Sequence, residues 1–131
     1  MTNYQGSCHC GAVTFSIATE ITDLYRCDCS LCHMKNAVMT TVHEDRFTLL
    51  GGEDRLSEYN WNTGVARHFF CSTCGIYPFH KKRTSPDHYG INVNCLAGFD
   101  ASSLPVRAAE GKTMTVKSAG ARDAWSGPRE T

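Results

Sequence analysis

Seven of the eight cysteines of this chain fall into three tight clusters, Cys8-x-Cys10, Cys27-x-Cys29-x-x-Cys32 and Cys71-x-x-Cys74. Protein-bound zinc takes four ligands in a tetrahedron, so four of these thiolates complete one site and three leave a second site with an open position. A closed site stabilises a fold, whereas an open site can bind and activate a ligand. The clusters therefore predict a metal-stabilised fold with one structural and one reactive zinc ion.

The length of 131 residues predicts one domain, spanning residues 1–131, with a core of modest size. The 13 basic residues balance 13 acidic ones, so charge gives no reason to expect a nucleic acid or an anionic membrane as partner. The chain has no apolar run long enough to cross a bilayer, and its first six residues lack the features of a secretion signal. We therefore expect a cytoplasmic protein, where reduced, clustered cysteines favour metal over disulfides.

Short segments with alternating apolar and polar residues predict a mainly β domain. The expected strands are 11–17, 24–26, 36–42, 46–50, 56–61, 65–70, 76–80 and 89–94, with a short one near 114–116. Residues 101–104 are expected to form one helical turn, capped by Asp100 and ended by Pro105, and Trp125 is expected to anchor the tail. A long apolar period of 3.6 residues is missing from the sequence, which argues against a helical bundle.

Cys71-Ser72-Thr73-Cys74-Gly75 has the spacing of a zinc knuckle, in which two sulfurs face one ion across a tight turn. One knuckle supplies half of a tetrahedron. Cys8 and Cys10, also followed by a glycine, are the candidate second pair. A structural zinc contributes on the order of 10 kcal/mol or more of apparent binding free energy, which would support a small core.

The central cluster brings Cys27, Cys29 and Cys32 within six residues, with a fourth metal position left open. Three thiolates give the zinc site a net negative charge, which disfavours hydroxide formation and favours a thiol as the fourth ligand. The alternative is that all seven cysteines are structural and that His33, His43 or Cys95 completes the second tetrahedron. An iron–sulfur cluster is not favoured, because neither common ferredoxin run is present.

Several neighbouring residues are candidates for parts of a site. His33 follows Cys32 and could donate a proton to an alkoxide; it could also be exposed or be a fourth zinc ligand. On a strand, Arg67 and His68 point to opposite faces, so one of them can reach a pocket. The run 80–83 is interpreted as a solvated turn, with capture of a substrate carboxylate as the alternative. The aromatic candidates for a cleft, or simply for the core, are Tyr59, Trp61, Phe69 and Tyr77.

Together these residues resemble the glutathione-dependent formaldehyde-activating enzyme family, which also includes centromere protein V. The similarity is carried by the segments 6–11, 27–32 and 70–75 and extends through 90–98 to Trp125. It implies a β-tent fold of small antiparallel sheets. It also implies a structural zinc on Cys8, Cys10, Cys71 and Cys74, and a second zinc on Cys27, Cys29 and Cys32 where glutathione binds.

The family's named activity joins glutathione and formaldehyde into S-(hydroxymethyl)glutathione and is classed as a carbon–sulfur lyase. The resemblance therefore implies two zinc ions as cofactors, and a small thiol and an aldehyde as partners. One departure is Asp28, because members often have histidine between the first two cysteines of the central cluster. A non-catalytic zinc-stabilised binding module and a zinc or redox sensor are the alternative functions.

Overall fold

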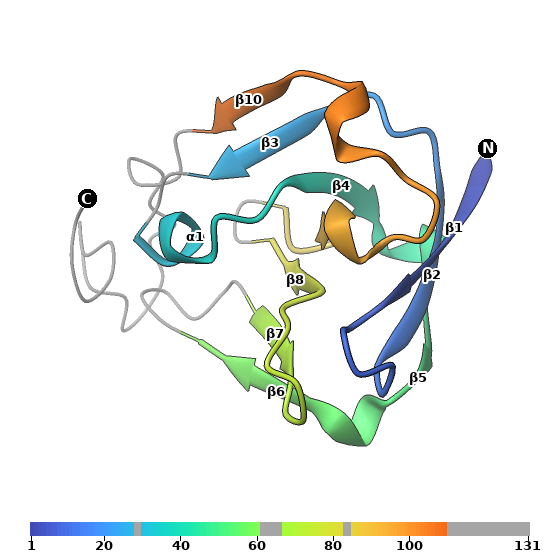
Figure 1. Cartoon of the computed structure of the whole chain (residues 1–131), viewed down its shortest axis with the longest axis vertical. Coiled ribbons are helices and arrows are strands. Elements are labelled where there is room, and N and C mark those ends of the chain that lie inside the picture. The colour runs from blue at the N-terminus through green and yellow to red at the C-terminus, as the bar shows by residue number, and fades with distance from the viewer. Residues whose placement is uncertain (28–29, 61–66, 83–84, 110–131) are drawn as a thin grey trace.

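The computed structural model describes residues 1–27, 30–60, 67–82 and 85–109. Within these ranges the strands form two sheets. The smaller sheet has the order β1-β2-β5, with β1 at Thr2–Ser7, β2 at Thr14–Thr19 and β5 at Phe47–Gly51. In Figure 1 these strands lie on the right, next to the N-terminus.

The larger sheet has the order β10-β3-β4-β9-β8-β7-β6. Its strands are β3 (Leu24–Cys27), β4 (Met39–His43), β6 (Leu56–Tyr59), β7 (Arg67–Cys71), β8 (Phe79–Lys81), β9 (His88–Asn92) and β10 (Val106–Ala109). Neighbouring strands are antiparallel except β10 and β3, which are parallel. The mainly β prediction is confirmed.

The core lies where the two sheets face each other. The rings of Phe15 on β2 and Phe79 on β8 meet edge to face, with centroids 5.4 Å apart. Phe47 on β5 packs against the same Phe79 ring at 4.8 Å. Ile17 and Ile91 are buried in the same cluster. On β2 the buried Phe15 and Ile17 alternate with less buried residues, as expected for a sheet with one buried face.

One α-helix, α1 (Ser30–Lys35), follows β3 and occupies the position where the sequence predicted only a turn. It ends at Asn36, which adopts φ 51° and whose N–H donates to the Cys32 carbonyl at 2.9 Å. Asparagine tolerates this left-handed conformation better than most residues, and it commonly ends helices. Cys32 is therefore presented from a helix rather than from an extended segment.

The 3₁₀ helices are η1 (Glu44–Arg46), η2 (Glu53–Arg55), η3 (Val93–Cys95) and η4 (Ala101–Ser103). The last one confirms the predicted helical turn: an Asp100 carboxylate oxygen accepts from the Ser102 N–H at 2.9 Å. In the described ranges, no helix has both the length and the apolar character needed to cross a membrane.

Two strands were not predicted from the sequence, β1 and β10, and three predicted strands begin three residues later than expected. One of them is the expected strand 36–42, which starts at Met39. The expected strand 11–17 starts at Thr14, because residues 8–13 form a turn. The expected strand 76–80 starts at Phe79. The predictions for Trp61, 114–116 and Trp125 lie outside the described residues.

Candidate metal centre and thiol site

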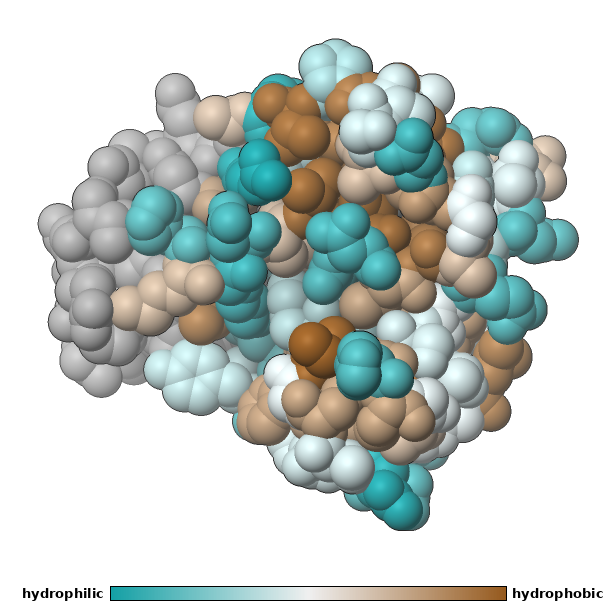
Figure 2. All heavy atoms as spheres, in the orientation of Figure 1, coloured by the Kyte–Doolittle hydropathy of each residue, from teal (hydrophilic) through white to brown (hydrophobic). Residues whose placement is uncertain are grey.

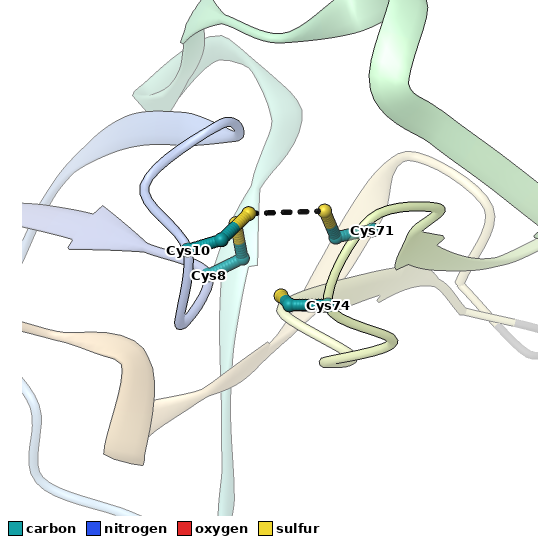
Figure 3. Close-up of side chains that lie close together, drawn as sticks. All are labelled: Cys8, Cys10, Cys71 and Cys74. Atoms are coloured by element: carbon teal, nitrogen blue, oxygen red, sulfur yellow. Dashed lines mark hydrogen bonds between the residues drawn. The ribbon is translucent and has the colours of Figure 1, made fainter.

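Cys8, Cys10, Cys71 and Cys74 converge on one point, with all four sulfur atoms within 4.8 Å of one another (Figure 3). The Sγ atom of Cys10 lies 3.7 Å from the Sγ atom of Cys8 and 3.7 Å from that of Cys71. A zinc tetrahedron with Zn–S bonds of about 2.3 Å has sulfur–sulfur edges of about 3.8 Å. The spacing of these thiols therefore fits a metal ion such as zinc, and this part of the prediction is confirmed as a site that can hold a metal.

The two cysteine pairs are presented by similar turns. The Gly11 N–H donates to the Cys8 carbonyl at 3.2 Å, and the Gly75 N–H donates to the Cys71 carbonyl at 2.7 Å. Both glycines have positive φ, 83° and 78°, which other residues adopt at a cost. The Val13 N–H then points at Cys8 Sγ, 3.3 Å away. These turns aim backbone N–H groups at the sulfurs, as expected for thiolate ligands.

Backbone N–H groups of these turns favour the thiolate form of Cys71 and Cys74. The backbone N–H of Ile76, followed by that of Cys10, lowers the pKa of Cys74 to about 6. The pKa of Cys71 is also lowered, first by the Cys74 N–H. At Cys10 the Ala12 N–H lowers the pKa, but desolvation and the neighbouring thiols outweigh it and raise the pKa to about 11. One proton leaves this cluster readily, and a cation is needed to hold four thiolates together.

The four-cysteine cluster lies where the two sheets meet. Cys8 directly follows β1 in the small sheet, and Cys71 is the last residue of β7 in the large sheet. Cys8 is 4% exposed and Cys71 is fully buried. An ion here would join the two sheets and leave no ligand position for a substrate.

The central cluster lies at a different place, where β3 passes into α1. Cys27 is the last residue of β3 and Cys32 lies in α1. Burial raises the pKa of Tyr25 to about 12; the Thr41 hydroxyl opposes this, and the charges of Cys32 and Cys27 add to it. Both thiols therefore lie near enough to the Tyr25 hydroxyl to influence its pKa. Cys29 and Asp28 lie outside the described residues.

The side chain of Lys82 lies near Cys27. Lys82 donates from Nζ to the Thr41 hydroxyl at 3.0 Å and lies 5.1 Å from the centroid of the Tyr25 ring. Burial lowers its pKa, as does Arg107, whereas Cys27 raises it. The interpretation of 80–83 as a solvated turn is wrong for its described part, because β8 continues through Lys81 and places Lys82 against the large sheet.

Two histidines that the sequence singled out only weakly are buried on the same face of this sheet. His68 and His80 are 4% and 9% exposed, and their rings stack with centroids 5.1 Å apart. As expected from strand alternation, Arg67 turns outward instead and pairs with Glu58 at 2.8 Å. The signal that could have found His80 is Gly90, its cross-strand partner, where an added Cβ would lie 2.4 Å from the imidazole.

The three residues considered as a fourth ligand of the second site lie in different surroundings. His33 is exposed on α1. His43 is held by two carboxylates, with Nδ1 2.8 Å from Asp45 and Nε2 3.2 Å from Asp87. Burial raises the pKa of Cys95 to about 11, with added contributions from the charges of Cys8 and Cys74, so this thiol belongs to the neighbourhood of the four-cysteine cluster.

The aromatic candidates divide between core and site. Phe69 packs on Phe79 at 5.4 Å and belongs to the core edge, whereas Tyr59 is 43% exposed. Tyr77 contacts His80, which places it beside the central cluster. Trp61 lies outside the described residues.

Comparison with known proteins agrees with this arrangement. A family model described as "Glutathione-dependent formaldehyde-activating enzyme" matches residues 3–116. A crystal structure of a Rhodobacter sphaeroides protein is similar over 80% of this chain and 99% of that chain, with 37% sequence identity and a TM-score of 0.77. The family match spans both cysteine sites and most of the described strands. The chain therefore belongs to the glutathione-dependent formaldehyde-activating enzyme family.

Proposed function

We propose that this protein is a zinc-dependent carbon–sulfur lyase that joins the thiol of glutathione, or a similar small thiol, to formaldehyde or another small aldehyde, and catalyses the reverse reaction. Cys27, Cys29 and Cys32 are proposed to hold the reactive zinc, and Cys8, Cys10, Cys71 and Cys74 the structural one. The observation that carries the proposal is the position of Cys27 and Cys32 at the junction of β3 and α1, near Tyr25 and outside the four-cysteine cluster.

When bound by three thiolates, zinc supplies a thiophilic centre that favours the deprotonated form of an added thiol. The surrounding residues adjust the charge. The raised pKa of Tyr25, due first to its burial, keeps the phenol neutral, so it adds no negative charge beside the cysteines. Lys82 brings positive charge to the same region, which supports an anionic thiol substrate.

The reaction itself needs little rearrangement. The sulfur of the substrate thiolate forms a bond to the carbonyl carbon, the carbon–oxygen π pair moves to oxygen, and that oxygen takes up a proton. In reverse, the hydroxyl proton leaves and the carbon–sulfur bond breaks. His33 is exposed beside Cys32 and is proposed to exchange protons between the site and solvent.

The partners proposed for this activity are a small thiol and an aldehyde, with no nucleic acid or membrane involved. The activity is assigned to one domain over residues 1–131 in the cytoplasm. This cellular setting supplies reduced glutathione and keeps the cysteines available for metal.

The test is the rate at which purified, zinc-loaded protein interconverts free glutathione and its formaldehyde adduct, followed by exchange NMR. We expect acceleration by the wild type, none by Cys29→Ala, and wild-type behaviour from Cys95→Ser, which removes a thiol outside the central cluster. A wild type that binds two zinc ions but leaves the exchange rate at its uncatalysed value would refute the enzyme proposal and favour the binding module.

A further inference from the structure

A cluster of four polar side chains lies beside the central cysteines and has no part in the chemistry described so far. Its members are Lys35, His68, Tyr77 and His80. Lys35 Nζ is 3.1 Å from His68 Nδ1 and 3.3 Å from the centroid of the Tyr77 ring. The Tyr77 hydroxyl hydrogen-bonds His80 Nδ1. The lysine is therefore held in one place by an imidazole and an aromatic face.

The large sheet places this cluster and the cysteines on one face. His68 pairs with His80, His80 with Gly90, and Gly90 with Thr41, so these positions form one row across neighbouring strands. Tyr25 pairs with Met39, two residues before Thr41, and so lies on the same face; its hydroxyl is 3.2 Å from the Thr41 hydroxyl. Residues two apart on a strand share a face, so Cys27 lies on the same side as Tyr25.

Helix α1 brings its own residues to that face. Cys32 and Lys35 are three positions apart, which places them on one side of the helix with their Cβ atoms about 5–6 Å apart. The contacts of Lys35 with His68 and Tyr77 show that this side faces the sheet. His33 is exposed instead. Figure 2 shows hydrophilic side chains at the surface near α1.

The ammonium group of Lys35 is a hydrogen-bond donor in this cluster. Because an ammonium group has only donors, His68 Nδ1 accepts a hydrogen bond from Lys35 Nζ. Burial holds the pKa of His80 well below its ordinary value, with the charges of His68, Lys35 and Lys82 adding to the effect. Burying two imidazoles beside a cation costs free energy that apolar residues would not cost, which is typical of groups kept for chemistry.

Building on the proposed function, we infer that Lys35 is the catalytic acid that serves the aldehyde oxygen, and that His68 and Tyr77 are positioning residues that hold its ammonium group. As the thiolate sulfur bonds to the carbonyl carbon, the oxygen gains the π pair and takes a proton from Lys35 Nζ. The resulting amine regains a proton from water. In reverse, the neutral amine accepts the hydroxyl proton while the carbon–sulfur bond breaks.

The test compares Lys35→Met and Lys35→Arg with a matched control, Lys81→Met. Lys81 lies on β8 next to His80, but its Nζ pairs with Glu44 and lies over the Tyr89 ring, on the opposite face of the sheet. Exchange NMR gives the rate of adduct formation, calorimetry gives the glutathione affinity, and elemental analysis gives the zinc content of each protein.

We expect Lys35→Met to lower the exchange rate by about 100-fold or more, as for loss of a general acid, with glutathione affinity changed by less than about threefold. Zinc content should stay that of the wild type, and Lys81→Met should match the wild type throughout. Lys35→Arg should bind glutathione normally but lose the alkaline fall in rate that the wild type shows as Lys35 deprotonates, because a guanidinium stays protonated.

Three results would overturn the inference: an unchanged rate in Lys35→Met, a rate loss matched by an equal loss of glutathione affinity or zinc, or an equal rate loss in Lys81→Met. If Lys35→Met does not fold, the pH dependence of the exchange rate of Lys35→Arg decides. A fall in that rate at alkaline pH equal to the fall in the wild type refutes the assignment. A wild type without any exchange activity overturns the proposed function together with this inference, whereas an active wild type and an active Lys35→Met overturn the inference alone.

Discussion

Replacing Cys74 by serine removes one of the four ligands that join the turn after β1 to the turn after β7. The ligands Cys10 and Cys71 lie 61 residues apart in sequence, with sulfurs 3.7 Å apart. In the chain-entropy model, a cross-link that closes a loop of this length constrains the unfolded chain by about 4 kcal/mol at 25 °C. A domain of this size is stable by only about 5–15 kcal/mol. We therefore expect Cys74→Ser to lose about 4 kcal/mol or more of unfolding free energy.

The assay is urea unfolding of zinc-loaded proteins followed by circular dichroism, with the metal held in slight excess. Cys29→Ala and Cys95→Ser are the matched controls, because each removes one thiol outside the four-cysteine cluster; both should stay within about 1 kcal/mol of the wild type. A Cys74→Ser protein as stable as these controls would refute the structural role of the four-cysteine cluster. Equal destabilisation of all three variants would refute the division into two sites.

Two further predictions concern the buried histidines. Gly90→Ala would place a Cβ 2.4 Å from the His80 ring, so we expect its free energy of unfolding in urea to fall by about 1–3 kcal/mol. The control is Gly51→Ala, whose Cβ meets only the Thr14 hydroxyl oxygen at 3.3 Å and which should lose less than about 1 kcal/mol. Equal losses in the two variants would contradict the close packing at His80. Because burial depresses the pKa of His80 in the fold, the unfolded chain binds a proton that the native protein does not, so wild-type stability should fall as the pH drops below about 6.5, and His80→Gln should show a shallower fall between about pH 7 and 5. An identical slope in the two proteins would show that His80 is not the group responsible.

Much of the fold follows from local patterns in the sequence. Strands β3, β5, β6 and β9 lie close to the positions at which strands were expected, and Asp100 caps the short helix it was expected to cap. Such features depend on residues close together in sequence, which is why they can be predicted.

The missed elements depend on distant partners. β1 has a mostly exposed, polar sequence and becomes a strand through its six-residue register with β2. β10 pairs in parallel with β3, and the Arg107 guanidinium holds the Asp23 carboxylate with two 2.8 Å bonds across 84 positions. α1 is six residues long, too short to show a helical period in the sequence.

The site divides in the same way. The four-cysteine cluster was predictable because ligand spacing and the following glycines specify each half locally. The cluster of Lys35, His68, Tyr77 and His80 was not, because it exists only once β7, β8 and β9 adopt their register and α1 lies on that face. Strand alternation predicts that Arg67 and His68 point to opposite faces of the sheet, but it does not predict which of them is buried.

The central claim is that the chain carries two separate cysteine sites, one closed and structural, the other open to a thiol. The most direct measurement is the zinc content per folded chain of wild type and Cys29→Ala, before and after a mild chelator. We expect two zinc ions per folded wild-type chain, of which the chelator removes one. The folded Cys29→Ala protein should hold a single zinc ion that resists the chelator. A wild type that never holds more than one ion, or a Cys29→Ala protein that loses both, would contradict this claim.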